Sequence, residues 1–235
     1  MRSIIYLTDN SLDPEIMALC QRVLAEAAGD IPIISVSQKP TDFGVNVCMG
    51  EMGRNWLSLY KQLLMGARVA ETEWVVIAEH DCLYTSEHLN HTPETSTEFW
   101  YNDNRWLVQW GGNHPELNGM YSKWPGKAAL SQLVCNRALL EGCIAERVEI
   151  LEGGDSAKVF GKAEPGVTRW AKSGRPVWLR GYLAEHMDKY ESRTFKTVLP
   201  NLDIRHGTNF TGPKRGNRRR YELPYWGRFE DVWQR

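Results

Sequence analysis

The hydrophobic pattern in the amino-terminal part of the chain alternates between strand and helix periods. Ser3–Thr8 is a short β-rich run that meets a polar segment at Asp9, which predicts a buried strand entering a loop. Apolar side chains then recur at helical spacing, with Asp13 placed to cap a helix and Pro14 suited to its first turn. Ile31–Val36 is a second apolar run. This order predicts a βαβ unit.

A second helix and a third strand follow the same rule. Trp56–Val69 has helical spacing, and Trp74–Ala78 is a continuous apolar run of the kind found in parallel strands covered on both faces. This run ends directly at Glu79-His80-Asp81. Ligands of open α/β sheets bind beyond the carboxyl ends of the strands. The loops around Asp9, Gln38 and this triplet are therefore expected to meet in one crevice.

The periodicity weakens from about residue 92, where the composition turns to Trp, Asn, Gly and Pro. This half is expected to be rich in loops, with helices at about Ser131–Val148 and Leu183–Tyr190. No internal repeat or low-complexity linker divides the chain. The pattern predicts one α/β domain over residues 1–235, with a mixed, mostly parallel sheet flanked by helices.

The overall charge of the chain does not indicate a particular class of partner. The chain has 28 Lys and Arg against 29 Asp and Glu, so no chain-wide field indicates nucleic acid or membrane. Residues 201–235 nevertheless carry eight basic and four acidic side chains. This segment is locally cationic.

The cysteines and the apolar runs indicate the cellular compartment of the protein. Five cysteines without CxxC spacing argue against a disulfide framework and a zinc ribbon. The first apolar run is too short for a signal peptide, and no apolar stretch approaches the roughly 20 residues that cross a bilayer. We expect a cytoplasmic protein with no membrane partner.

The acidic triplet carries the most specific candidate chemistry. Glu79 and Asp81 place two carboxylates directly beyond a buried strand. Mg²⁺ and Mn²⁺ accept carboxylate oxygens and use their remaining positions for phosphate oxygens and water. Such an ion would neutralise charge that develops on a departing diphosphate. The alternative is that these acids cap a helix or lie in a surface loop.

The order of these elements resembles the nucleotide-binding half of family-2-like GT-A glycosyltransferases. In that family the apolar strand ends in an Asp-x-Asp motif, of which Asp81 matches the last acid and Glu79 replaces the first. The resemblance implies a GT-A, Rossmann-like fold with a nucleotide-sugar half at 1–91, an acceptor-side half at 92–200 and a basic segment at 201–235. It implies that Asp81 binds Mn²⁺ or Mg²⁺, while Glu79 makes a ribose or water-mediated contact.

The same resemblance implies contacts to the donor, a nucleoside diphosphate sugar. Thr8, Asp9 and Asn10 after the first strand, and Gln38 after the second, would touch the nucleoside. Arg54 occupies a place where the family often has Gly or Arg-Asn near the base and the sugar. The alternatives are that Asp9 only caps a turn and that Arg54 only caps a surface helix.

His206 ends a short β-like run and is followed by Gly and Asn. It resembles the late histidine that completes the metal site in many GT-A enzymes, and imidazole is a plausible Mn²⁺ ligand. A solvent-exposed or helix-capping histidine is the alternative. A zinc site built on the Glu79–Cys82 segment with His88 and His91 is not favoured, because the spacing fits no closed structural site.

Two further segments are weaker candidates. Lys214 and Arg215 could clamp the donor diphosphate, or together with Arg218–Arg220 grip the phosphates of a nucleic-acid acceptor. A merely solvated charge run is the alternative. The aromatic segment Trp106–Tyr121 could stack on a sugar ring or a base, although tryptophan is also a common core residue.

An inverting transfer needs a general base. By position, the resemblance points first to Asp155 and second to Glu152, with Glu185 a further candidate.

The resemblance therefore implies a metal-dependent glycosyltransferase, whose acceptor we expect to be a glycan or a hydroxymethylated base in DNA. No GxGxxG, Walker or nucleophile-elbow motif is present. Two alternatives stay open. One is a non-catalytic nucleic-acid-binding protein that uses the basic segment. The other is a sugar nucleotidyltransferase, which normally has a Gly-rich, Arg-Lys loop where this chain has Thr8–Ser11.

Overall fold

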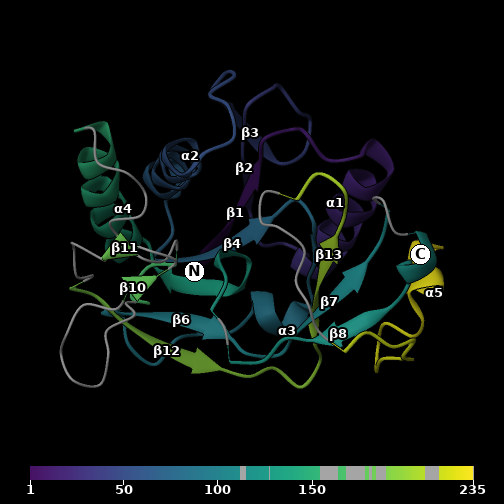
Figure 1. Ribbon diagram of the computed structural model, residues 1–235. Coiled ribbons are helices and arrows are strands. Elements are labelled where there is room, and N and C mark those ends of the chain that lie inside the picture. Colours follow the sequence, from purple (N-terminus) through teal and green to yellow (C-terminus); the bar gives the residue numbers. More distant parts are fainter. Residues whose placement is uncertain are drawn as a thin grey trace.

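The computed structural model describes residues 1–111, 115–126, 128–153, 164–167, 178–179, 182–183, 189–209 and 217–234. Its largest sheet has seven strands in the order β12-β6-β9-β4-β1-β2-β3 (Figure 1). Their bounds are β1 Arg2–Thr8, β2 Ile33–Ser37, β3 Val45–Cys48, β4 Trp74–Glu79, β6 Glu98–Asn102, β9 Leu133–Asn136 and β12 Glu191–Phe195. Only β9 runs antiparallel to its neighbours; the pairs β1–β2, β1–β4, β2–β3 and β6–β12 are parallel. The predicted α/β class with a mostly parallel sheet is confirmed.

Helices cover both faces of this sheet. Helices α2 (Trp56–Val69) and α4 (Arg137–Glu152) pack on one face, over a core that includes Ile5 and Leu63 (Figure 1). Gly66 lets α2 approach β1 closely, because a Cβ at this position would lie 2.4 Å from Cγ2 of Ile5. A small residue is thus required where helix and strand meet.

Helix α1 (Pro14–Ala28) lies between the large sheet and a second, four-stranded sheet. Its carboxyl-terminal part packs on the large sheet through Leu24, whereas Ile16 and Leu19 belong to the core of the second sheet. The second sheet has the order β5-β13-β7-β8. Its bounds are β5 Cys82–Leu83, β13 Asn201–Arg205, β7 Arg105–Gln109 and β8 Tyr121–Lys123.

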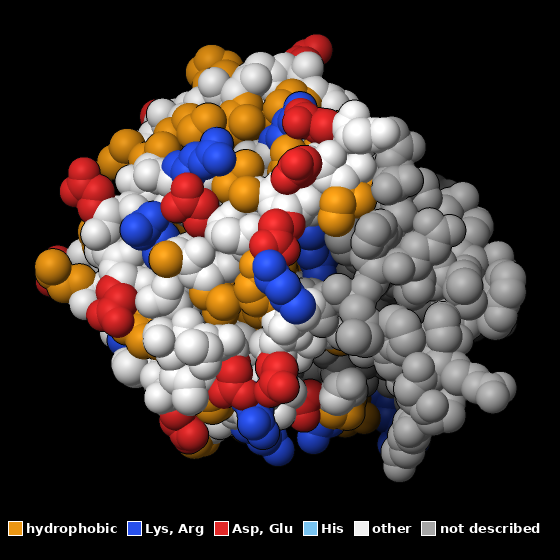
Figure 2. Space-filling model, turned by 90° about the vertical axis from the view of Figure 1, so that its left-hand side faces the viewer, with side chains coloured by type: hydrophobic (Ala, Val, Ile, Leu, Met, Phe, Trp, Pro, Cys, Tyr) orange, Lys and Arg blue, Asp and Glu red, His pale blue; other side chains and the backbone are white. Residues whose placement is uncertain are grey.

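The remaining elements are short. They are α3 Ser86–Leu89, α5 Phe229–Trp233, the 3₁₀ turns Pro115–Leu117 and Leu130–Gln132, and the antiparallel pair β10 Trp178–Leu179 and β11 Tyr182–Leu183. Within the described ranges, no helix is both long and apolar enough to cross a membrane. On the face turned to the viewer in Figure 2, acidic and basic side chains alternate with hydrophobic ones and neither charge forms a continuous patch.

The strands and helices predicted up to Glu79 are present. Helix α1 begins as expected, because Asp13 Oδ1 accepts a hydrogen bond from the backbone of Glu15 at 2.9 Å. Helix α2 begins with a reciprocal capping box between Asn55 and Ser58. Strand β3 was not predicted within the Gly-rich connection before α2.

The prediction was less accurate in the second half. Helix α4 begins at Arg137 rather than near Ser131, because Leu133–Asn136 forms β9 and Asn136 caps the helix. The helix predicted at Leu183–Tyr190 is wrong at its start, since Leu183 belongs to β11, and residues 184–188 lie outside the described ranges. Strands β6 to β9, β12 and β13 give this half more regular structure than its weak periodicity indicates.

Three described tryptophans of this half contribute to the hydrophobic core. Trp100 is buried with 6% of its surface exposed, and Trp106 and Trp110 pack on the core of the second sheet. The ring of Trp110 stacks on Trp233 of α5, with 4.8 Å between their centroids. These contacts favour the core interpretation of the aromatic segment over the ligand-stacking one.

Candidate metal and nucleotide site

The candidate site lies where the chain order of the large sheet reverses. Strand β1 has β2 on one side and β4 on the other, and all three run parallel. Their carboxyl ends therefore share one edge. The chain continues from β1 to β2 on one side and from β4 to β6 on the other, and open α/β sheets bind ligands where the strand order reverses in this way. Oγ1 of Thr8, at the end of β1, lies 2.9 Å from Nδ1 of His80, just beyond β4. This contact joins the two loops across the reversal point.

A cavity of about 200 Å³ opens at this edge. Its wall includes seven of the residues predicted from the sequence: Thr8, Asp9, Gln38, Arg54, Glu79, Asp81 and His206. The expectation that the loops after β1, β2 and β4 meet in one crevice is thereby met.

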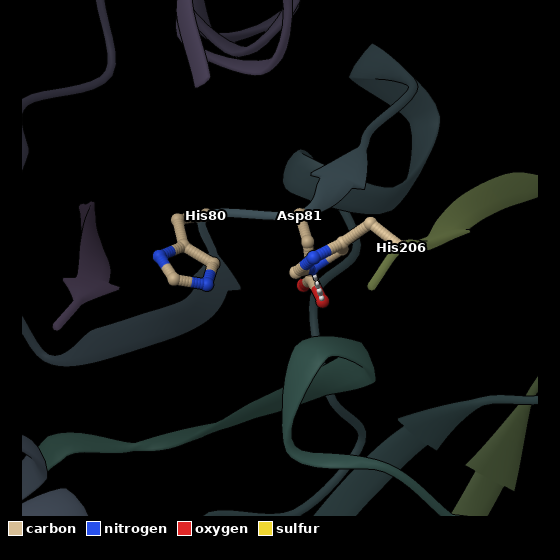
Figure 3. Close-up of side chains that lie close together, drawn as sticks. All are labelled: His80, Asp81 and His206. Atoms are coloured by element: carbon tan, nitrogen blue, oxygen red, sulfur yellow. Dashed lines mark hydrogen bonds and ion pairs between the residues drawn. The ribbon is translucent and has the colours of Figure 1, made fainter. Parts of the chain in front are cut away.

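Asp81 is held as an ionised carboxylate. Its Oδ2 atom accepts a hydrogen bond from Nδ2 of Asn209 at 2.9 Å and lies 3.4 Å from Nε2 of His206 (Figure 3). Burial alone would raise the pKa of Asp81, but the hydrogen bond with His206 and the charges of His80 and Arg205 outweigh it and lower the pKa to about 2. A metal ligand has to be deprotonated. Asp81 meets that condition at neutral pH.

His206 reaches Asp81 from the second sheet. It follows directly after β13 and is fixed by a tight turn, in which its backbone N–H donates to Oδ1 of Asn209 at 2.7 Å. Its Nδ1 atom lies 3.0 Å from Oγ1 of Thr208, so the other ring nitrogen, Nε2, faces Asp81. A carboxylate and an imidazole nitrogen from distant parts of the chain are thus brought together.

Glu79 differs from Asp81 in its environment. Burial, followed by the negative charges of Asp81 and Asp203, raises the pKa of Glu79 to about 8. Its backbone N–H donates to the hydroxyl of Tyr84 at 2.9 Å, which fixes the end of β4. Of the two carboxyl groups in the triplet, Asp81 is therefore the better ligand for a cation.

Arg54 brings positive charge to the rim of the cavity. It forms an ion pair with the carboxylate of Asp9, and its Nη2 atom donates to the backbone carbonyl of Thr208 at 2.6 Å. Burial alone would raise the pKa of Asp9, but hydrogen bonds from Ser11 and the charges of His80 and Arg54 lower it below its ordinary value. Arg54 consequently links the loop after β1 to the turn that carries His206.

Asn10 and Gln38 fix the loops at the ends of β1 and β2; Gln38 lines the cavity, whereas Asn10 is not among its lining residues. Oδ1 of Asn10 accepts hydrogen bonds from the backbone of Gln38 at 3.0 Å and of Lys39 at 2.8 Å. Nε2 of Gln38 donates to the carbonyl of Gly53 at 2.7 Å, and its Oε1 accepts from Met52. Asn10 therefore ties the loop after β1 to the loop after β2, and Gln38 ties the latter to the segment before α2.

Four further charged side chains, which were not predicted from the sequence, also line the cavity: Arg105, Glu164, Asp203 and Arg205. Arg105 and Asp203 form a buried ion pair, with 3.0 Å between Nη1 and Oδ2. Asp203 and Arg205 alternate with apolar residues in β13, so strand periodicity was the signal that could have placed both side chains on one face.

Glu152 lies elsewhere. It pairs with Lys61 at 2.6 Å, its side chain is 51% exposed, and it lines a different cavity, between α2 and α4. It is not among the residues of the Asp81 cavity. Asp155, Glu185, Lys214 and Arg215, named above as candidates, lie outside the described residues.

No protein-family model and no curated protein matches the sequence. Among solved structures, the bifunctional IspDF of Campylobacter jejuni aligns with a TM-score of 0.37 and 9% identity, over 63% of this chain and 44% of that one. A glycosyltransferase involved in glycosylation of the major capsid of PBCV-1 aligns with a TM-score of 0.39 and 9% identity, over 63% and 66%. A Drosophila β-1,4-galactosyltransferase 7 mutant, in complex with manganese, UDP-Gal and xylobiose, aligns with a TM-score of 0.33 and 11% identity, over 60% and 50%.

The chain thus spans less than two thirds of the length of each of these proteins. Alignments with such low scores do not establish a common function.

Proposed function

We propose that this protein is a metal-dependent glycosyltransferase that moves a sugar from a nucleoside diphosphate sugar to a hydroxyl acceptor. One observation supports this most: Asp81, an ionised carboxylate just beyond a central parallel strand, lies 3.4 Å from Nε2 of His206 in a cavity that several other charged side chains line. Carboxylate and imidazole side by side suit Mn²⁺. Mg²⁺ is the alternative ion.

The metal has a specific task in this proposal. Asp81 and His206 would hold it, and the bound ion would neutralise charge on the diphosphate as the sugar departs. A hard divalent cation bound by few protein groups keeps positions for phosphate oxygens. The site therefore fits a diphosphate donor better than a neutral one.

The other cavity residues would bind and orient the donor. Thr8, Asp9 and Gln38 line the cavity and would contact the nucleoside, while Asn10 fixes the two loops that carry them. Arg54 would exchange its contact with Asp9 for a phosphate oxygen, a charge-assisted hydrogen bond. Lys214 and Arg215 would add positive charge from the segment that follows His206. Glu79, with its raised pKa, would donate a hydrogen bond rather than bind the ion.

The acceptor hydroxyl needs a base if the reaction inverts. Asp155 is the proposed base. Glu152 would have to leave its ion pair with Lys61 and the cavity between α2 and α4 to serve in its place. Glu164 already lines the Asp81 cavity and is the carboxylate to test beside Asp155.

The proposed acceptor is a glycan, with a hydroxymethylated base in DNA as the second candidate. The DNA hypothesis depends on the basic segment, where Arg220 forms an exposed ion pair with Glu230 at 3.2 Å. Phosphate contacts weaken steeply as salt rises. Transfer to such DNA should therefore fall with salt and on neutralising Arg218–Arg220, and transfer that did neither would exclude docking through these arginines.

The test of the proposal is release of a nucleoside diphosphate. The purified protein is incubated with UDP-, GDP-, CDP- and ADP-sugars, with Mn²⁺ or with EDTA, and products are identified by mass spectrometry. Metal-dependent release that is lost in Asp81→Asn supports glycosyl transfer. Full turnover by Asp81→Asn with metal present contradicts it.

A parallel incubation with nucleoside triphosphates and sugar 1-phosphates separates the two alternatives. From these substrates a sugar nucleotidyltransferase forms a nucleotide sugar and releases pyrophosphate instead of a nucleoside diphosphate. A non-catalytic nucleic-acid-binding protein turns over no sugar nucleotide and binds DNA without metal or nucleotide.

A further inference from the structure

His80 lies between Glu79 and Asp81 in the chain, and its ring lies beside the proposed metal site (Figure 3). One ligand atom each from His80, Asp81 and His206 lies within 4.8 Å of the other two. At metal–ligand distances of about 2.0–2.2 Å, ligands on opposite sides of an ion are roughly 4.2 Å apart. The three atoms are thus close to the spacing of one coordination sphere.

The two histidines are held in the same way. Nδ1 of His80 lies 2.9 Å from Oγ1 of Thr8, and Nδ1 of His206 lies 3.0 Å from Oγ1 of Thr208. In Figure 3 one nitrogen of the His80 ring points away from Asp81, and the other faces the side where Asp81 and His206 lie. Each ring therefore has one nitrogen occupied by a threonine and the other turned toward the carboxylate.

This arrangement matches what orients histidine ligands in metalloproteins. A ligating imidazole usually donates its second N–H to an oxygen, which fixes the tautomer and leaves the lone pair of the other nitrogen for the metal. The carboxylate of Asp9 lies 3.7 Å from Nδ1 of His80 and favours a proton on that nitrogen. The lone pair of His80 is then on Nε2, on the side of Asp81.

Resting on the proposed function, we infer that His80 is a third protein ligand of the metal, so that the centre consists of two imidazole nitrogens and one carboxylate. Such a set favours ions that accept nitrogen ligands, such as Mn²⁺, Co²⁺ or Zn²⁺, over Mg²⁺, which prefers oxygen. Thr8 and Thr208 are the positioning residues of the two rings. The open positions of the ion are left for the diphosphate.

The first test counts nitrogen ligands in the absence of nucleotide and sugar. Pulsed electron paramagnetic resonance of Mn²⁺ bound to the protein should show couplings from two imidazole nitrogens in the wild type, and from one in His80→Ala and in His206→Ala. His91→Gln is the control, because His91 does not line the cavity, and it should keep both. A single imidazole in the wild type, or no bound Mn²⁺, would overturn the inference.

The second test measures affinity. Removing one ligand should weaken Mn²⁺ binding by His80→Ala at least about tenfold, while excess Mg²⁺ should displace little Mn²⁺ from the wild type. Unchanged affinity, or equal competition by Mg²⁺, would overturn the inference. Should His80→Ala not fold, as judged by circular dichroism, Thr8→Val serves instead: it removes the partner of Nδ1 and should weaken Mn²⁺ binding while both imidazole couplings stay.

These outcomes are distinct from those of the proposed function. A one-imidazole centre leaves metal binding by Asp81 and His206 intact and removes only the role of His80. A two-imidazole centre in a protein that releases no nucleoside diphosphate from any donor removes the glycosyltransferase proposal and leaves the metal centre.

Discussion

The side-chain amide of Asn209 donates a hydrogen bond to Oδ2 of Asp81 at 2.9 Å, although 128 residues separate them in the chain. The same side chain accepts the backbone N–H of His206 at 2.7 Å. Asn209 thus fixes both the carboxylate and the turn that presents the imidazole. Loss of a group that orients metal ligands typically lowers metal affinity about 10- to 100-fold.

Replacing Asn209 should therefore weaken metal binding without unfolding the protein. We expect Asn209→Ala to bind Mn²⁺ about 10- to 100-fold more weakly, as measured by calorimetry. Asn217→Ala is the matched control, because this asparagine is exposed, and it should bind as the wild type does. Equal Mn²⁺ affinity in the two variants would show that the side chain of Asn209 is not required to position the metal ligands.

Arg54 should contribute to nucleotide affinity and not to metal affinity. It lies on the cavity rim between Asp9 and Thr208, and a hydrogen bond to a charged group is worth about 1.5–3 kcal/mol. Arg54→Ala should weaken binding of the preferred nucleoside diphosphate about 10- to 100-fold in the presence of Mn²⁺. Mn²⁺ binding alone should be unchanged; a parallel loss of both would place Arg54 at the metal instead.

Two glycines in helices should respond oppositely to alanine. In Gly66→Ala the new methyl would lie 2.4 Å from Ile5 Cγ2, and such overpacking costs about 1–3 kcal/mol. In Gly142→Ala, within α4, the nearest atom is the Tyr190 hydroxyl at 3.8 Å, so alanine should stabilise the helix by up to about 1 kcal/mol. Urea unfolding measures both, and equal effects would mean that α2 does not approach β1 this closely.

Stability should fall on mild acidification because of His88. Its ring is fully buried, stacks on Tyr84 and Phe195, and has Nδ1 at 3.3 Å from Nδ2 of Asn102. Burial, followed by the charge of His91, lowers the pKa of His88 to about 3. The unfolded chain therefore takes up a proton below about pH 6.5 that the folded chain does not.

The contribution of His88 to the free energy of unfolding therefore decreases as the pH falls. The contribution of His88 is constant above about pH 6.5 and is lost at about 1.4 kcal/mol per pH unit as the pH falls from there toward 3. His88→Gln keeps an acceptor for Asn102 and does not titrate. Between pH 6.5 and 5 the free energy of unfolding of His88→Gln should fall by about 2 kcal/mol less than that of the wild type. Identical pH profiles of the two proteins would show that another group causes the loss of stability in acid.

The elements of the first half were predictable from the sequence, because their apolar residues follow clear strand or helix periods. Helix α2 was placed at Trp56–Val69 from its apolar spacing alone, and those are its bounds in the structure. Strand β9 was missed, because four residues, Leu133–Asn136, are too few to show a period and run directly into α4. Strands of this kind are defined by pairing with distant partners, here β4 and β6.

The candidate site was predictable to the extent that it lies at strand ends. Asp81 and Asp9 follow apolar runs, and the edge of a parallel sheet brings them to one cavity. Asn209 and Arg105 could not be assigned, because their roles depend on contacts with Asp81 and Asp203 across more than ninety residues of chain. Sequence patterns carry no record of such pairings.

The most direct test of the central claim is calorimetry of the purified protein with UDP, GDP, CDP and ADP, each with and without Mn²⁺, on the wild type and on Asp81→Asn. We predict that one nucleotide binds, that Mn²⁺ strengthens its binding, and that Asp81→Asn loses the Mn²⁺ dependence while remaining folded. Binding of a nucleoside diphosphate that is indifferent to Mn²⁺ and to Asp81, or no binding of any of the four, would contradict the assignment of this cavity as a metal-dependent donor site.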